Sequence, residues 1–492
     1  MDYLDLNKQF RQRITLLVGY VLIAVAISTG TIILLYQAYG FGLGKNGAVI
    51  QNELTFFSSH PNPANIYANN QRQPVTTNTR LTLPSGIYHF KLTRTGYHDW
   101  QRNIELQGGG VVHFDYPFLF PVSLTTDKLQ TLTGEPGLAS QSPDRRWWVV
   151  EQPGSMTDFA VYDLKNSAKP ATALTLPANL LTKPSTNENW QLVEWADDNR
   201  HVLLQHNFDG KNEFILLDRI TPDLSINLNR TLVSETGQLT LKNKKYNGYY
   251  LFDSATKTLQ TATLGAPTLL PVQQRVLAYK SYGNNTVLYV TDSGAPADKV
   301  LVKLRVGNKI YPIRTLPVGN IFLVDLTEYS GTLYVAAGDN SDNKVYIFKD
   351  PVGQLTAQPN QAVVPVQVLH VPAPNYLSFS NNTQFIVASN ANRFGVYDAE
   401  NELGYNYTVQ KTLDAPQQHA TWMDGDRLIM TSGGKLVVFD YDGTNVQTLM
   451  PAHSAYIPAF APDFKSVFSL VASPTAGQLD LTQTYLLTAA DR

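Results

Sequence analysis

The chain has 492 residues, more than one hydrophobic core usually supports, so two or more domains are expected. Its 38 basic and 40 acidic residues nearly cancel, which argues against a nucleic-acid-binding surface, because phosphate recognition needs a concentrated positive field. There is no cysteine, which excludes disulfides, thiolate metal sites, a cysteine nucleophile and a lipoprotein-type anchor. Abundant Tyr and Phe, with Gly and Pro along the whole chain, predict a mainly β protein.

The first predicted element is an uncharged run at residues 14–36. A helix of this length covers about 35 Å, enough for a hydrocarbon core of roughly 30 Å. Lys8, Arg11 and Arg13 precede the run, so the positive-inside tendency places residues 1–13 in the cytoplasm and the bulk of the chain outside the membrane. The alternative is a cleaved signal peptide, whose apolar region is normally only about 7 to 15 residues long. We therefore expect an uncleaved signal-anchor and a single-pass cell-membrane protein.

Residues 50–122 predict a small β-sandwich of six or seven short strands. Polar and apolar residues alternate in "IYHFKLT" and "QRNIELQ", and turn-forming residues separate these runs. The order of features resembles the PEGA domain, a small extracytoplasmic β module of bacteria and archaea. The matching parts are Ser59, Pro61, Ala64, Ile66 and Tyr67, the Thr-rich stretch before "LTLPSGIYHFKL", and the closing "GYHDWQRNIEL".

One position departs from this resemblance. Pro63 stands where the family has glycine, and proline fixes φ, so the turn must close differently. The resemblance implies a bacterial protein associated with the cell envelope or cell wall.

The segment "GYHDW" places His98 beside Asp99, which invites a catalytic reading. Neighbouring residues on a strand point to opposite faces, and the sequence around His98 and Asp99 indicates no serine or cysteine nucleophile. We therefore expect His98 and Asp99 to occupy a bend. Tyr97 and Trp100 are expected in the core, with a sugar-binding platform as the alternative.

Residues 137–490 repeat a unit made of an aromatic residue, a polar turn and an apolar strand. The copies begin at Trp195, Phe379, Trp422 and Phe460, with a weaker copy in "QSPDRRWWVV". Apolar strands that end on Asp recur about every 45 residues, the period of a four-stranded propeller blade. These aspartates are Asp163, Asp218, Asp253, Asp292, Asp350, Asp398, Asp440 and Asp480.

Eight such units predict a β-propeller of eight blades, with seven as the alternative. The Gly-His and Trp-Asp marks of WD repeats are absent, whereas "SPDRRWW" and "APDFKSV" resemble the Ser-Pro-Asp-Gly turn of TolB-like propellers. We expect each repeated aspartate to be a turn former after the third strand of its blade, hydrogen-bonded to the loop backbone, rather than a metal ligand or catalytic acid.

The remaining candidates for chemistry have structural explanations. His201 and His206 lie five apart on a predicted strand and so face opposite ways, which argues against a shared metal. The pairs Asp339/Asp342 and Asp440/Asp442 lack the spacing of a calcium loop and are expected at hairpin tips. No P-loop, nucleophile elbow or dinucleotide fingerprint occurs. We therefore predict no catalytic residue, no metal site and no cofactor.

These features predict a mainly β protein with one transmembrane helix, a PEGA-like sandwich and a seven- or eight-bladed propeller. The leading hypothesis is a non-enzymatic envelope protein that recognises a cell-envelope polymer or a surface or membrane protein. The alternatives are a structural subunit of an envelope complex, which predicts an exposed apolar patch, and a propeller glycan hydrolase or lyase. The enzyme predicts acidic or histidine side chains with shifted pKa values at one end of the channel.

Overall fold

The computed structural model describes residues 6–38, 40–43, 49–182, 187–232, 237–415 and 418–492. The chain divides into two compact units. One contains residues 1–123 together with Asp491, and the other contains residues 124–490 together with Arg492.

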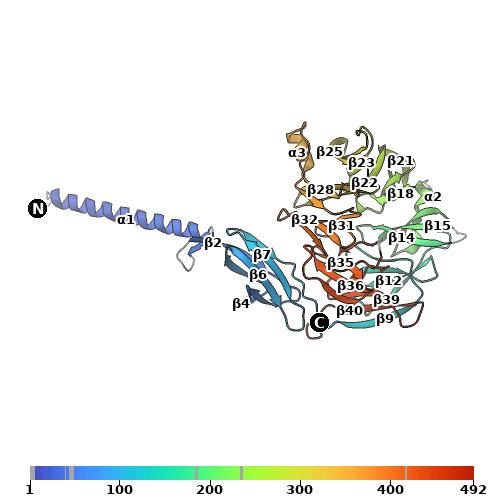
Figure 1. The fold of residues 1–492 in the computed structure, drawn as a ribbon, viewed down its shortest axis with the longest axis horizontal. Helices are drawn as coiled ribbons and strands as arrows, with labels where there is room; N and C mark the ends of the chain where they lie inside the picture. Colours follow the sequence, from blue (N-terminus) through green and yellow to red (C-terminus); the bar gives the residue numbers. More distant parts are fainter. Residues whose placement is uncertain (1–5, 39, 44–48, 183–186, 233–236, 416–417) are drawn as a thin grey trace. The chain divides into compact units, whose positions relative to one another are not determined.

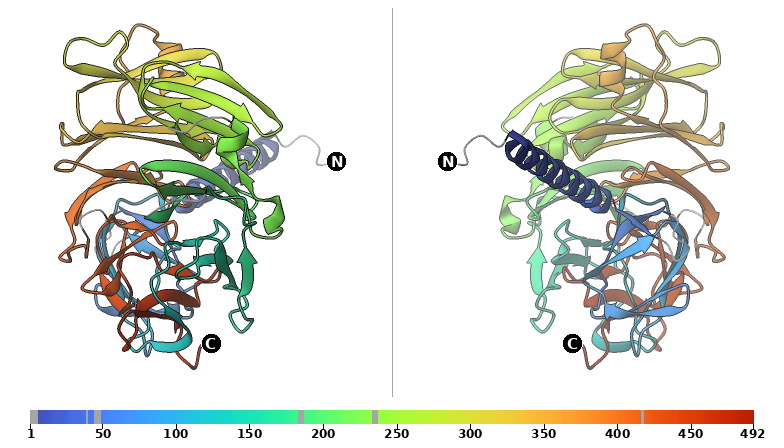
Figure 2. Two further views of the ribbon diagram at one scale, coloured as in Figure 1. Left: turned by 90° about the vertical axis from the view of Figure 1, so that its right-hand side faces the viewer. Right: turned by 90° about the vertical axis from the view of Figure 1, so that its left-hand side faces the viewer.

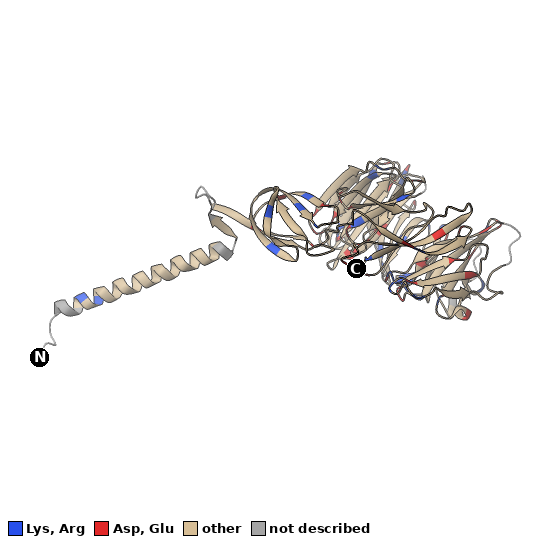
Figure 3. Ribbon diagram, turned by 90° about the horizontal axis from the view of Figure 1, so that it is seen from below, with Lys and Arg blue, Asp and Glu red and all other residues tan. Residues whose placement is uncertain are grey.

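The first element is α1 (Leu6–Ala38), a single uninterrupted helix (Figures 1 and 2). It begins before the predicted span 14–36, and residues 6–13 of the predicted tail belong to it. Its long apolar portion runs from Phe10 to Tyr36. Figure 3 shows basic residues of α1 only near its N-terminal end. In the sequence, Arg11 and Arg13 lie in this part of the helix. Length and composition suit a membrane anchor or a signal sequence.

The described part of the first unit has eight strands in two four-stranded sheets. In one sheet β1, β2 and β5 are neighbours and β8 lies parallel to β2, while the other has the order β4–β3–β6–β7. The strands are β1 (Phe41–Leu43), β2 (Val49–Phe57), β3 (Asn65–Ala68), β4 (Gln71–Thr76), β5 (Thr79–Pro84), β6 (Gly86–Thr93), β7 (Trp100–Leu106) and β8 (Val111–Phe114).

An aromatic core lies between these two sheets, as the alternating pattern requires. Phe57 packs edge-on against Phe90, with ring centroids 4.9 Å apart, and stacks on Phe114 at 5.1 Å. Trp100, at the start of β7, is 1% exposed and meets Phe114 edge-on. Tyr97 belongs to the same core.

The described part of the second unit contains eight four-stranded antiparallel sheets, the blades of a β-propeller. Blades 1 to 4 are β10 (Ala139–Gln141), β11 (Trp147–Glu151), β12 (Asp158–Asp163), β13 (Thr172–Thr175); β14 (Glu188–Trp195), β15 (His201–Phe208), β16 (Lys211–Asp218), β17 (Ile226–Asn227); β18 (Gly237–Leu241), β19 (Gly248–Asp253), β20 (Thr258–Thr263), β21 (Ala266–Gln273); and β22 (Val276–Tyr282), β23 (Thr286–Thr291), β24 (Lys299–Val306), β25 (Lys309–Pro317).

Blades 5 to 8 are β26 (Phe322–Tyr329), β27 (Thr332–Asp339), β28 (Lys344–Lys349), β29 (Gln367–His370); β30 (Tyr376–Phe379), β31 (Phe385–Asn390), β32 (Arg393–Asp398), β33 (Leu403–Thr408); β34 (Thr421–Trp422), β35 (Arg427–Ser432), β36 (Lys435–Asp440), β37 (Gln447–Pro451); and β38 (Ala459–Phe460), β39 (Ser466–Ala472), β40 (Gln478–Tyr485), β9 (Thr125–Thr133). Short helices lie in the connections: η1 (Pro222–Leu224), α2 (Leu228–Leu232), η2 (Lys242–Lys244) and α3 (Pro351–Ala357).

Blade 8 closes the ring by joining distant parts of the chain. Its outer strand β9 pairs antiparallel with β40 from Thr125–Tyr485 to Thr133–Gln478. Figure 1 shows β9 beside β40 accordingly. The repeat predicted a start at residue 137, which leaves β9 out, because β9 lacks the repeat motif and is recognisable only by its partner.

Apolar side chains fill the space between neighbouring blades. Most second and third strands of the blades are covered on both faces, so they are near-continuous apolar runs, whereas β24 ("KVLVKLRV") alternates. β31 ("FIVASN") and β36 ("KLVVFD") each have five buried residues. Between blades 6 and 7, Phe385 stacks on Tyr441 with ring centroids 4.0 Å apart. This double coverage explains why the apolar strands stand out in the sequence.

Candidate functional site

The first strand of each blade lies nearest the axis of a propeller, so its side chains line the central channel. The first strands of neighbouring blades contact one another, for example β22 with β26 and β26 with β30. Along blades 4 to 7 this wall is polar. It carries Lys280 on β22, Asp325 on β26, Tyr376 and Ser378 on β30, and His419 just before β34.

Asp325 connects three blades at this wall. Its carboxylate lies 3.5 Å from Nζ of Lys280 and accepts a hydrogen bond of 2.9 Å from the backbone N–H of Leu326. Burial raises the pKa of Asp325, and Lys280 and the backbone N–H groups of Leu326 and Phe379 oppose this rise. These contacts hold the innermost strands of blades 4, 5 and 6 together.

Tyr376 and His419 form the next part of the wall. Their rings stack with centroids 3.7 Å apart and an interplanar angle of 19°. Burial raises the pKa of the Tyr376 hydroxyl, and the hydrogen bond with Ser378 opposes the rise. His419 is exposed as a residue, but the protein around its ring desolvates the ring and lowers its pKa.

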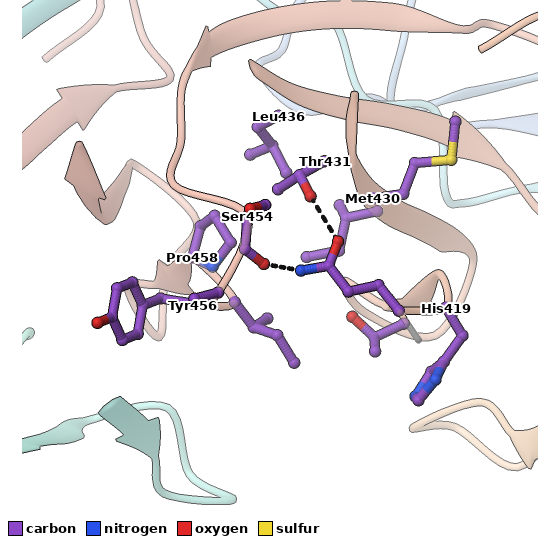
Figure 4. A pocket seen from close by; sticks show the side chains of 12 residues that line it. His419, Met430, Thr431, Leu436, Ser454, Tyr456 and Pro458 are labelled. Carbon is purple, nitrogen blue, oxygen red and sulfur yellow. Dashed lines mark hydrogen bonds between the residues drawn. The ribbon is translucent and has the colours of Figure 1, made fainter. Parts of the chain in front are cut away.

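A cavity of about 210 Å³ adjoins His419, between blades 7 and 8 (Figure 4). Gln418 fixes one wall, because its Oε1 accepts a hydrogen bond of 3.1 Å from Thr431 and its Nε2 donates to the carbonyl of Ser454. The rest of the lining is mostly apolar and includes Met430, Leu436, Ile457 and Pro458.

A second cavity of about 450 Å³ continues from the first, and the two share Ile429, Ile457 and Pro458. We call the two together the channel-mouth cavity. Its outer walls come from the turns between the first and second strands of blades 1, 6 and 7, through Arg145, Asn381 and Met423, and from Trp422 at the end of β34. Ile457 is 60% exposed here although it is a large apolar side chain.

Arg145 is the charged group of this lining. Its guanidinium lies 4.4 Å from the ring centroid of Phe464, and desolvation lowers its pKa, although Asp424 acts in the opposite direction. A cationic group beside an apolar opening lets the cavity take an apolar side chain with an adjacent acceptor.

The repeat motifs predicted the hairpin turns that line this cavity but not the polar wall of the channel. The turns after Gln141, Phe379 and Trp422 are hairpins, as the motif indicated. Lys280, Asp325, Tyr376 and His419 lie outside every motif copy and were missed. The one available signal was a charged residue inside an otherwise apolar strand, as in "FLVDLTEY".

The structural reading of "GYHDW" is confirmed. Tyr97 and Trp100 are buried in the core of the first unit, whereas His98 and Asp99 are exposed in the bend before β7. The backbone N–H of His98 donates a hydrogen bond of 2.8 Å to the carbonyl of Phe120. This bond holds the bend against the segment that contains Phe120.

Each blade has one of the repeated aspartates, and all but Asp480 lie at a turn, whereas Asp480 lies within β40 and accepts a hydrogen bond from Thr131 of β9. Asp163, for example, accepts from the backbone N–H of Lys165 at 3.2 Å and from Arg146. Their expected position was wrong in three blades. Asp253 is the last residue of β19 and Asp292 follows β23, and each of these is the second strand of its blade. Asp480 lies near the start of β40, the third strand of blade 8. The second strands have the same apolar composition as the third strands, so the sequence pattern does not tell them apart.

The other candidate ligands are also held by structural contacts. Asp339 accepts from the backbone N–H of Ser341 at 2.7 Å in the β27–β28 hairpin, and Asp442 accepts from that of Thr444 at 3.1 Å. His201 stacks on Tyr246, while His206 is buried elsewhere. Within the part of the chain that the structure describes, no three His, Asp or Glu side chains are grouped so as to hold a metal ion.

Comparison with known proteins finds structural similarity without sequence similarity. No protein-family model and no curated protein matches the sequence. The structure is similar to the Dos1 propeller (13% identity, TM-score 0.45, 73% of this chain and 96% of that chain) and to an oligogalacturonate lyase in complex with manganese (13%, 0.40, 74% and 99%). Hsv2 of Kluyveromyces lactis is similar too (11%, 0.40, 64% and 98%). Such similarity concerns the fold alone, and the eight sheets themselves define this chain as a β-propeller protein.

Proposed function

We propose that this protein is a membrane-anchored, extracytoplasmic cell-envelope protein whose propeller recognises a partner and which has no catalytic activity. The observation that carries the proposal is the channel-mouth cavity, in which Ile457 remains 60% exposed between rigid hairpin turns. Soluble surfaces that present large apolar groups in a hollow generally serve binding. The partner that fits best is a surface or membrane protein that inserts an apolar side chain beside Arg145.

The other parts of the chain support this placement. The charge-free stretch of α1 with basic residues before it favours an anchor with a cytoplasmic N-terminus. The first unit is an aromatic-cored sandwich built around Tyr97 and Trp100, which supports a PEGA-type module of a bacterial envelope protein. A rigid propeller that displays loops suits recognition of a protein or an envelope polymer.

The glycan hydrolase or lyase is the second candidate, and one observation favours it. His419 lines the cavity, Tyr376 stacks on it, and Asp325 lies further along the channel wall; all three have shifted pKa values, as that alternative predicts. The contacts of Asp325 favour the binding role, however, because Lys280 and two backbone N–H groups already engage its carboxylate.

A capture experiment with the full-length chain in detergent tests the proposal. The chain is cross-linked to solubilised envelope of its host as the wild type, as Ile457→Asp, and as Leu403→Asp. Leu403 is 53% exposed on β33 and is not part of the cavity, so it is the matched control. A defined protein captured by the wild type and by Leu403→Asp, but lost with Ile457→Asp, is the expected result.

The other outcomes separate the alternatives. Capture that survives Ile457→Asp contradicts recognition through the cavity and favours a structural subunit with another interface. Release of sugar fragments from host wall polymer by the wild type, abolished by Asp325→Asn, would establish the enzyme instead.

A further inference from the structure

A hollow of about 670 Å³ lies on blade 2, separate from the channel-mouth cavity. Its lining comes from β14, β15, β16 and the turn between β15 and β16. Five of its nine lining residues carry a carboxamide: Asn187, Asn189, Gln205, Asn207 and Asn212. We call this hollow the carboxamide groove. Its volume is in the range of sites that bind small molecules.

The strand register brings these side chains to one face of the sheet. Asn189 on β14 is directly opposite Asn207 on β15, and Asn207 is directly opposite Asn212 on β16. Gln205 lies two residues before Asn207 and so points the same way. Two residues before Gln205 on β15, the same face carries the apolar Leu203, which packs against blade 3. The groove therefore begins where the contact with blade 3 ends.

Hydrogen bonds between the carboxamides fix their orientation. Nε2 of Gln205 donates 2.6 Å to Oδ1 of Asn207, and Nδ2 of Asn207 donates 3.1 Å to Oδ1 of Asn189. The chain starts at the Gln205 carbonyl, an acceptor, and ends at the Asn189 amino group, a donor. These ordered groups point into a hollow that is open to solvent.

The opposite face of the same strands is rigid. His206 is fully buried between Glu188 and Glu213, with ring nitrogen to carboxylate oxygen distances of 3.0 and 2.9 Å. Trp190 packs against the His206 ring at a centroid distance of 5.1 Å. A support of this kind lowers the cost of ordering the groove upon binding.

We propose that the carboxamide groove binds an uncharged oligosaccharide. A carboxamide offers a donor and an acceptor in one plane, which matches the adjacent hydroxyl groups of a sugar ring. The charged groups of the lining are Asp209 and Lys211, one of each sign, so the groove does not select an ionic ligand. It is formed by the face of a sheet and not by an open edge, which disfavours an added peptide strand.

Binding measurements on the full-length chain in detergent test this inference. Isothermal titration is performed with three tetrasaccharides, of β-1,4-linked glucose, of β-1,4-linked N-acetylglucosamine and of α-1,4-linked glucose. At least one is expected to bind with a Kd below about 1 mM. Asn189→Ala/Asn207→Ala should weaken that binding about 10-fold, since it removes at least two hydrogen bonds.

Controls separate loss of the groove from loss of the fold. Asn207→Asp keeps the shape and removes the donor, and it should weaken binding in the same direction. Asn406→Ala removes an exposed carboxamide on β33 and should leave the Kd unchanged. Absence of binding by all three sugars, equal binding by the double variant, or selective binding of an extended Ser-Gly octapeptide would each overturn the proposal. Because Ile457 is not involved, these outcomes are independent of the partner-capture experiment.

Discussion

Glu151, at the end of β11, is a carboxylic acid held in an apolar interface. It is 4% exposed, and its Oε2 atom has no hydrogen-bond partner. Burial raises its pKa to about 7, although the backbone N–H groups of Gly137 and Leu138 oppose the rise. The folded protein therefore retains a proton that the unfolded chain releases near its ordinary pKa of 4.5. Stability is consequently lost as the pH rises from 4.5 towards 7.

Glu151→Gln should remove this pH dependence. The substitution keeps the size of the side chain and removes the charge, so we expect stabilisation by about 3 kcal/mol at pH 8 and almost none at pH 4.5. Denaturant unfolding at the two pH values measures the difference. The exposed Glu105 on β7 provides the control Glu105→Gln, which should change neither value. Equal stabilisation at both pH values would contradict a titrating Glu151.

His206 is the second residue whose role is set by burial. Each ring nitrogen faces a carboxylate oxygen, of Glu188 and of Glu213. Burial alone would raise the pKa of Glu213, but hydrogen bonds from His206, Thr182 and Asn227 outweigh burial and lower the pKa to about 2. Glu213 is thus an ionised group that depends on its donors.

His206→Leu should destabilise the protein by about 3 kcal/mol, because it removes a hydrogen-bond donor from the buried, ionised Glu213 carboxylate. Urea unfolding measures the change. His206→Gln retains a donor and should recover part of the loss, whereas His370→Ala, at an exposed histidine on β29, should have no effect. A loss equal for Leu and Gln would indicate packing as the cause rather than hydrogen bonding.

At the scale of elements, blade 8 pairs two strands, β9 and β40, that lie far apart in the sequence. Thr126 and Thr484 are directly opposite each other on β9 and β40, and their hydroxyl oxygens are 2.8 Å apart. Since the chain has no cysteine, Thr126→Cys with Thr484→Cys introduces the only two thiols.

Oxidation of this double variant should form a disulfide and raise the Tm by several degrees, because it cross-links a very long loop in the unfolded chain. A mobility shift on a non-reducing gel and thermal unfolding with and without reductant provide the readouts. Thr126→Cys with Ala472→Cys is the control, since Ala472 lies at the opposite end of the β39–β40 pair. An absent disulfide in the first variant would contradict the β9–β40 register.

The elements that the sequence predicted are those with double-sided burial or strong turn chemistry. Trp195, Phe379, Trp422 and Phe460 each end a first strand before a hairpin, as expected from the aromatic–turn–strand motif. Counting one blade for each recurring Asp predicts eight blades. This equals the number of four-stranded sheets in the described part of the second unit.

The channel wall was beyond prediction for a physical reason. Several first strands are short or bulged, with register shifts at Leu192/Glu194 on β14 and Val276/Ala278 on β22. A bulge reverses which residues face the axis, so alternation along β22 does not identify Lys280. The β9–β40 pair was unpredictable because its two strands are separated by the whole propeller sequence.

At the scale of the whole molecule, the fate of α1 decides whether the two units stay at a membrane, because α1 suits either an anchor or a signal sequence. A cleaved signal peptide would release them, whereas an uncleaved helix keeps them at the membrane. The charge-free stretch of α1 from residue 14 to 36 exceeds the usual signal-peptide core, and the small residues of "AVA" at residues 24–26 lie inside it, away from a peptidase. Both features support the proposed anchor role of α1.

Two observations in the native host test this anchor. Mass spectrometry of the mature chain should recover peptides from before residue 14, and the protein should stay with membranes through alkaline carbonate extraction. Ile23→Arg with Ile27→Arg places two charges at the centre of the helix, at about 2.5–3.5 kcal/mol each, and should abolish membrane retention. Tyr36→Arg is the control, because an arginine at the helix end reaches the interface and leaves retention intact. A soluble mature chain that begins after residue 26 would show instead that α1 is a signal sequence, and the envelope role would then require another means of attachment.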